Sequence, residues 1–136
     1  MKNLLENNLV LKKRAKRLFK IYLFFLLLIL FLSSLYTFLI YNKVINPSIT
    51  SFNNTSFIIG IICFFILGLI SGSSANKNGF LDAFICSLIV IMFVSVLNLF
   101  MKEEFTKLTF IKSSIYVLTS SLGGIIGLNM NKKKEK

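Results

Sequence analysis

The stretch that decides the fold is IYLFFLLLILFLSSLYTFLIY, residues 21–41, which contains no charged side chain and directly follows Lys20. A bilayer core about 30 Å thick is crossed by roughly 20 helical residues, so this stretch predicts a membrane-spanning helix. It exceeds the roughly 7–15 apolar residues of a cleavable signal, and no small-residue cleavage motif follows Tyr41. We therefore interpret it as a retained signal anchor.

Three more apolar stretches follow the first, at about residues 57–75, 81–101 and 113–130. They are close to the minimum spanning length, which favours tilted helices or a locally thinned bilayer. The sequence therefore predicts an all-α protein, an antiparallel four-helix transmembrane bundle. We expect a basic N-terminal segment, residues 1–20, a transmembrane domain, residues 21–131, and a basic tail, residues 132–136.

The composition excludes a typical soluble enzyme. Of 136 residues, 55% are hydrophobic and 15% are charged, and the mean hydropathy is +0.78, whereas soluble domains carry about 25% charged residues. The chain has no His and only five acidic residues, so groups for acid–base catalysis are scarce. Cys63 and Cys86 form no CxxC motif and are predicted at different depths. We expect no catalytic activity, cofactor, metal or disulfide.

The net charge of +11 is concentrated at both ends of the chain. By the positive-inside rule both termini then face the cytoplasm, which agrees with four crossings. The richness in Lys, Asn, Ile and Phe suggests a low-GC bacterium and therefore a multi-pass protein of the bacterial cytoplasmic membrane. The basic residues are not interleaved with aromatic ones on a folded surface, so we do not expect nucleic-acid binding.

A basic cluster precedes the first span. Two interpretations remain open: a helix that lies on the anionic inner leaflet, where each basic residue contributes on the order of 1 kcal/mol, and a frayed tail that only sets the orientation. The residues of this basic cluster are Lys12, Lys13, Arg14, Lys16, Arg17 and Lys20. Tyr22, Tyr41 and Tyr116 fall near the predicted membrane interfaces and are expected to be anchors.

Small residues are concentrated in spans two to four, and they allow helix backbones to approach in lipid. We therefore expect these three spans to pack closely and the bulky first span to be peripheral. The turn at residues 76–79 contains Gly and Asn, which tolerate a positive φ, and predicts a tight hairpin. The candidate packing residues are Gly60, Gly68, Gly72, Ala83, Ser87, Gly123, Gly124 and Gly127.

A shift of 55 positions superposes residues 67–77 on residues 122–132 with several identities, including Gly68 on Gly123 and Gly72 on Gly127. Two hairpins of the same orientation would make a parallel tandem repeat. Coincidence remains an alternative, because Gly and Lys recur at membrane ends for general reasons.

Three polar residues lie in or near the predicted spans. Asp82 begins the third span, where a carboxylate stabilises the helix N-terminus and Lys77 is near in sequence; ion or proton coupling is the alternative. Asn129 is a candidate hydrogen-bond partner for Asp82. Asn98, near the outer end of the third span, is expected to serve packing.

The sequence resembles the YrzE-like small membrane proteins of low-GC Gram-positive bacteria. The resemblance rests on Gly68-x-x-x-Gly72 before the turn at 76–79, and on GGIIGLN, residues 123–129, followed by lysines. It covers roughly residues 57–134, while the longer basic N-terminus departs from the usual pattern. The resemblance implies four spans and, because that family has no established function, no catalytic or binding residues.

Two classes of function fit these features. The first is a non-catalytic accessory or scaffold subunit whose glycine-lined helices dock onto a membrane-protein partner or onto copies of itself. The alternative is a small oligomeric transporter or channel, with a holin-like pore as a variant. A proton-coupled exporter needs an acidic residue deep in the membrane, and Asp82 is shallow.

Overall fold

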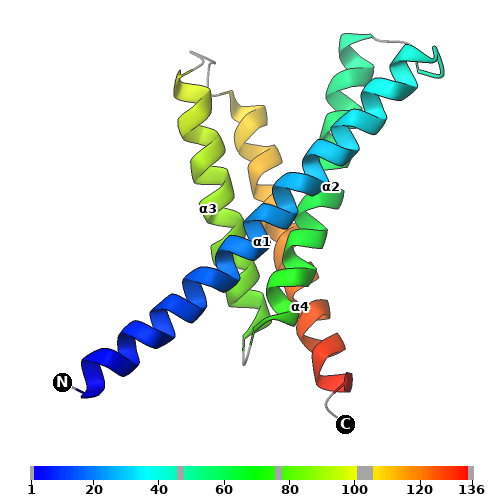
Figure 1. The fold of residues 1–136 in the computed structure, drawn as a ribbon. Helices are drawn as coiled ribbons and strands as arrows, with labels where there is room; N and C mark the ends of the chain where they lie inside the picture. The colour runs from blue at the N-terminus through cyan, green and yellow to red at the C-terminus, as the bar shows by residue number, and fades with distance from the viewer. Residues whose placement is uncertain (1, 46–47, 76–77, 101–105, 135–136) are drawn as a thin grey trace.

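The computed structural model describes residues 2–45, 48–75, 78–100 and 106–134, and this part of the chain contains four α-helices and no strand. Figure 1 shows α1 (Lys2–Tyr41), α2 (Ile49–Ser73), α3 (Gly79–Phe100) and α4 (Lys107–Lys134). The fold is therefore the predicted all-α helical bundle. The first helical residue of α1 and the last of α4 lie at the same end of the bundle.

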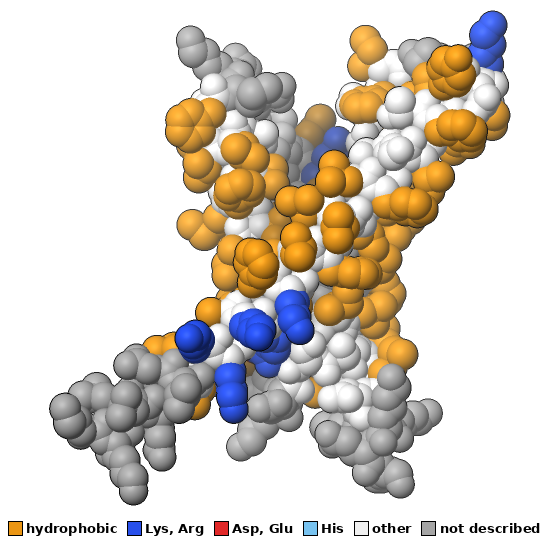
Figure 2. Space-filling view, in the orientation of Figure 1, with side chains coloured by type: hydrophobic (Ala, Val, Ile, Leu, Met, Phe, Trp, Pro, Cys, Tyr) orange, Lys and Arg blue, Asp and Glu red, His pale blue; other side chains and the backbone are white. Residues whose placement is uncertain are grey.

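All four helices are long and apolar enough to cross a membrane, over Val10–Tyr41, Ile49–Ser73, Gly79–Phe100 and Lys107–Asn131. Many large apolar side chains, such as Phe31 and Phe93, are exposed along their outer faces. Figure 2 shows apolar side chains covering much of the upper part of the molecule. Such a surface is stable only when lipid or another apolar partner covers it.

Local hydrogen bonds set the first helix boundary. Lys43 adopts a positive φ of 57°, and its N–H donates to the carbonyl of Ile40 at 2.9 Å. The N–H of Val44 donates to the carbonyl of Leu39 at 3.1 Å. This pair of bonds is a Schellman motif, which satisfies carbonyls at the end of α1. The Ser48 side chain then caps α2 by accepting from the Ser51 N–H at 3.1 Å.

The closest helix pair is α2 and α4, and α3 packs against both of them, whereas the backbone of α1 approaches only that of α2. Figure 1 shows α1 running obliquely across the other helices, with its N-terminal part projecting away from them. This arrangement confirms the expectation of three closely packed spans with a peripheral first span. Bulky residues along α1 keep its backbone at a distance from the others.

The buried core between α1 and α2 contains Ile21, Phe25, Cys63, Phe64 and Leu67. The rings of Phe25 and Phe64 meet edge to face with their centroids 5.5 Å apart. An aromatic partner from α4 completes this core, because the ring of Tyr116 stacks on Phe64 at 4.9 Å. Tyr116 is thus half-buried in helix packing, not only an interfacial anchor.

Residues 2–20 form the first part of α1, in the same helix as the first span. The segment is therefore helical and continues directly into the first span. Tyr22 and Tyr41 lie on the same helix; Tyr41 is exposed at the opposite end from the basic cluster.

Candidate functional site

The seam between α2 and α4 is made by direct backbone contact at glycines. A Cβ atom on Gly68 would overlap the carbonyl oxygen of Ser120, and one on Gly72 would overlap the carbonyl oxygen of Gly124. Any side chain at these positions would therefore push the helices apart. The small residues permit the close approach that supplies van der Waals energy between helices in lipid.

The contacts from α4 to α2 mirror those from α2 to α4. Gly123 lies against the carbonyl oxygen of Phe65, and Gly127 lies against that of Leu69. Under the 55-residue shift Gly68 corresponds to Gly123, and each glycine meets the carbonyl three residues before the other. The same relation holds for Gly72 and Gly127. The seam thus has the reciprocal geometry expected when two helices pack through matched small-xxx-small motifs.

The start of α3 also packs on this seam. A Cβ on Gly79 would crowd the carbonyl oxygen of Gly124, and one on Gly124 would crowd the Cβ of Ala83. None of the described glycines has a positive φ, and neither has Asn78. Gly79 therefore serves close helix approach instead of a positive φ, and residues 76 and 77 of the turn lie outside the described residues.

Small polar residues of α3 and α4 are bonded within the bundle. Ser87 and Ala83 are fully buried, and the Ser87 hydroxyl donates to the Phe84 carbonyl at 2.9 Å. The Ser120 hydroxyl donates across helices to the Ala83 carbonyl at 3.3 Å. Gly60, farther along α2, lies against a side chain instead of a backbone, namely the Tyr116 ring.

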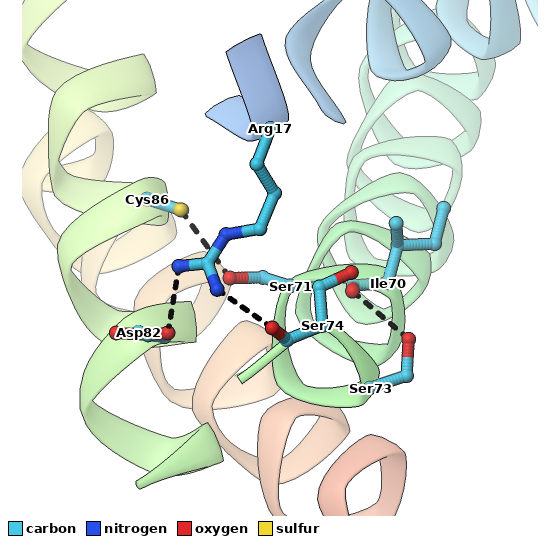
Figure 3. Close-up of polar contacts among 7 residues, drawn as sticks. All are labelled: Arg17, Ile70, Ser71, Ser73, Ser74, Asp82 and Cys86. Carbon is cyan, nitrogen blue, oxygen red and sulfur yellow. Dashed lines mark hydrogen bonds and ion pairs between the residues drawn. The ribbon is translucent and has the colours of Figure 1, made fainter. Parts of the chain in front are cut away.

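A polar junction joins three helices at one end of the bundle, as Figure 3 shows. The Arg17 guanidinium of α1 donates from Nη1 to the carbonyl of Ser74 at 2.6 Å, and its Nη2 lies 3.2 Å from Oδ2 of Asp82. Both side chains are about one-third exposed, at 34% for Arg17 and 37% for Asp82. Water therefore screens the ion pair, which limits its contribution to stability.

The position of this junction follows from the dipoles of the helices. Ser74 caps the C-terminus of α2, where carbonyls lack helical partners and carry partial negative charge. Asp82 lies in the first turn of α3, where the partial charge is positive. A cation at the first end and an anion at the second are both favourable, and their mutual contact ties α1 to the hairpin of α2 and α3.

Sequence reasoning placed Asp82 at a helix end but did not identify Arg17 as its partner. It named Lys77 instead, which lies outside the described residues. A usable signal was present: Arg17 lies one helical turn before Ile21 and Asp82 lies one turn after Gly79, so both were expected at the same membrane surface. Pairing charged residues by depth across different hairpins would have suggested this contact.

Above the ion pair, α3 is joined to its neighbours through Cys86. The Ser71 hydroxyl donates to the Cys86 sulfur at 3.3 Å, and the Tyr22 hydroxyl donates to the Cys86 carbonyl at 3.4 Å. Cys63 and Cys86 are both buried and free. Within the part of the chain that the structure describes, no three His, Cys, Asp or Glu residues are grouped as a metal site would need.

The structure does not bring the other two predicted polar residues to this junction. Asn129 is exposed on α4 and does not hydrogen-bond with Asp82. Asn98 is half-buried near the far end of α3, and its side chain has no hydrogen bond with a described residue. Within the basic cluster, Arg17 is half-buried, while Lys12, Lys13, Arg14, Lys16 and Lys20 are exposed.

Four apolar helices, a glycine seam and a charged junction at one end together define a multi-pass α-helical membrane protein. The chain belongs to the family described as Protein of unknown function (DUF3792), whose model matches residues 14–127. The matched region includes both Arg17 and Asp82. No curated protein and no solved structure matches the chain.

Proposed function

We propose that this protein is a non-catalytic accessory or scaffold subunit of the bacterial cytoplasmic membrane, related to the YrzE-like small membrane proteins. The observation that carries the proposal is the glycine seam. Backbones fill the space between α2 and α4, and the Ser120 hydroxyl is bonded to α3. A transport path needs space or polar groups between the helices, and the filled seam between α2 and α4 leaves neither. The seam therefore favours a rigid support.

We place the docking surface of this scaffold on a different face from the one that the sequence suggested. The sequence hypothesis assigned docking to the glycine-lined helices, but Gly68, Gly72, Gly123 and Gly127 are buried within the chain. The outer face of α1 is the better candidate. It exposes a stripe of large apolar residues at helical spacing, and α1 has only one close backbone neighbour. The stripe consists of Phe24, Leu27, Phe31 and Phe38.

Site-specific photo-crosslinking in native membranes tests this proposal. A photo-reactive residue in place of Phe31, which is 64% exposed, should capture a different membrane protein that mass spectrometry can identify. The matched control is the same probe in place of Leu67, which is 1% exposed and should capture only this chain.

The two unfavourable outcomes differ in meaning. Capture of lipid alone from position 31 would contradict a partner on this face. Capture of copies of this chain alone would favour the oligomeric transporter or channel, and Asp82→Asn would then be assayed for loss of transport with normal expression.

A further inference from the structure

A groove of about 740 Å³ opens between the N-terminal part of α1 and the start of α3. Its wall on α1 is one face of the helix, because the residues recur three, four, seven and eight positions after Val10. Asp82, Ile85 and Cys86 of α3 form the opposite wall with Asn78. The residues on the α1 wall are Val10, Lys13, Arg14, Arg17 and Leu18.

The charge of this groove is unbalanced. Arg17 is already bonded to Asp82 and to the Ser74 carbonyl. Lys13 and Arg14 are exposed beside it, and neither forms an ion pair with a described residue. Two cationic groups therefore remain to attract an anion, and Arg and Lys donors bind phosphate oxygens through short charge-assisted hydrogen bonds.

The walls also contain apolar residues beside the cationic ones. Arg17 precedes by one turn the uncharged stretch that starts at Ile21, and Val10 and Ile85 are 53% and 52% exposed. Figure 2 shows the Lys and Arg side chains gathered on α1 next to apolar side chains. A soluble phosphate would use only the cationic part of this surface, whereas a phospholipid would use both parts.

We propose that this groove is a binding site for one anionic phospholipid. Lys13 and Arg14 donate to its phosphate, and an acyl chain lies along Leu18 and Ile85. Arg17 is a positioning residue, because its contacts with Ser74 and Asp82 hold α1 at the distance that forms the groove. The proposal does not depend on the accessory role.

Lipid titration of the purified full chain in neutral detergent tests the site, with native mass spectrometry counting the retained lipids. Detergent removes the surface potential of a leaflet, so only local contacts remain. The double variant Lys13→Gln/Arg14→Gln should bind phosphatidylglycerol about tenfold more weakly or worse, since it loses two charge-assisted hydrogen bonds to the lipid phosphate. Phosphatidylcholine should bind weakly to every variant.

The matched control is Lys12→Gln/Lys16→Gln, which removes the same charge from side chains that do not line the groove. This variant should bind phosphatidylglycerol with an affinity within about two-fold of the unmodified protein, because Lys12 and Lys16 make no local contact with the lipid phosphate in the groove. Equal losses in both double variants would show diffuse attraction and overturn the proposal.

Inorganic phosphate separates a lipid from a soluble anion. It should neither displace phosphatidylglycerol nor raise the melting temperature as that lipid does. If it does both, the groove is an anion site without a role for the acyl chain, and the proposal is wrong. Unchanged circular dichroism of both double variants establishes that the comparison is between folded proteins.

Discussion

At the residue scale, what surrounds a glycine decides how a substitution acts. The neighbour of Gly68 is the Ser120 carbonyl, which belongs to a helix backbone, whereas the neighbour of Gly60 is the ring of Tyr116. A backbone can yield only if a whole helix moves, while a ring can rotate or shift. The same added methyl group should therefore have different costs at the two positions.

We predict that Gly68→Ala lowers the free energy of unfolding by about 1–3 kcal/mol, the usual cost of overpacking. Gly60→Ala should lower it less. Unfolding in mixed micelles with increasing sodium dodecyl sulfate measures both values. Equal losses at the two positions would show that backbone contact is not the cause.

A second residue-scale prediction concerns the polar junction. Arg17→Gln should lower the free energy of unfolding by about 1 kcal/mol or less, because the ion pair is partly exposed and screened. The double exchange Arg17→Asp/Asp82→Arg restores opposite charges but should not restore stability. Aspartate cannot donate to the Ser74 carbonyl, and an arginine in the first turn of α3 opposes the helix dipole.

The same micelle unfolding assay, applied to Arg17→Asp, to Asp82→Arg and to the double exchange, tests this explanation. Full recovery in the double variant would mean that the ion pair alone stabilises the junction. The helix-end contacts would then contribute nothing measurable.

At the scale of elements, the reciprocal seam predicts equivalent behaviour at equivalent positions. Gly72→Ala would overlap the Gly124 carbonyl, and Gly127→Ala would overlap the Leu69 carbonyl. We predict similar losses of about 1–3 kcal/mol for each. The double variant should lose less than their sum, because the first substitution already separates the helices. A neutral result at one position would show that the seam is not reciprocal in energy.

The boundaries of the helices show what hydropathy can predict. Apolar stretches indicated the four spans, but α2 begins at Ile49 instead of about 57, and α4 begins at Lys107 instead of about 113. The added turns contain polar residues such as Asn53 and Asn54. Hydropathy reports which residues prefer lipid. The ends of a helix are set instead by the groups that cap its free backbone donors and acceptors, as Ser48 does at the start of α2.

The site was predictable to a smaller extent. Small residues indicated the packed faces of α2 to α4, because backbone approach depends on side-chain size alone. They could not show whether a face meets the same chain or another. The Arg17–Asp82 contact joins helices of different hairpins, and local patterns within one helix carry no record of such a partner.

At the scale of the whole molecule, the basic cluster marks one end of the helical bundle. The cluster lies at the end of the bundle where Ser74 and Asp82 meet Arg17. The start of α1 and the end of α4 are at that same end. If the positive-inside rule holds, this end is cytoplasmic.

We predict that a fluorescent protein that folds only in the cytoplasm is fluorescent when fused to either terminus. Alkaline phosphatase, which is active only outside the cytoplasm, should be active when inserted after Val44. Expression levels of the fusions provide the control. An active phosphatase fused after the C-terminal lysines would contradict the proposed topology.

The reciprocal contacts between α2 and α4 also bear on ancestry. A chain whose halves meet through equivalent residues has the form expected when a gene for a self-associating hairpin is duplicated and its copies are joined. Before fusion, every substitution would appear in both copies at once. After fusion the copies can diverge, and the outer helices of the two hairpins do pack differently here: the backbone of α1 approaches only that of α2, whereas α3 packs against both α2 and α4.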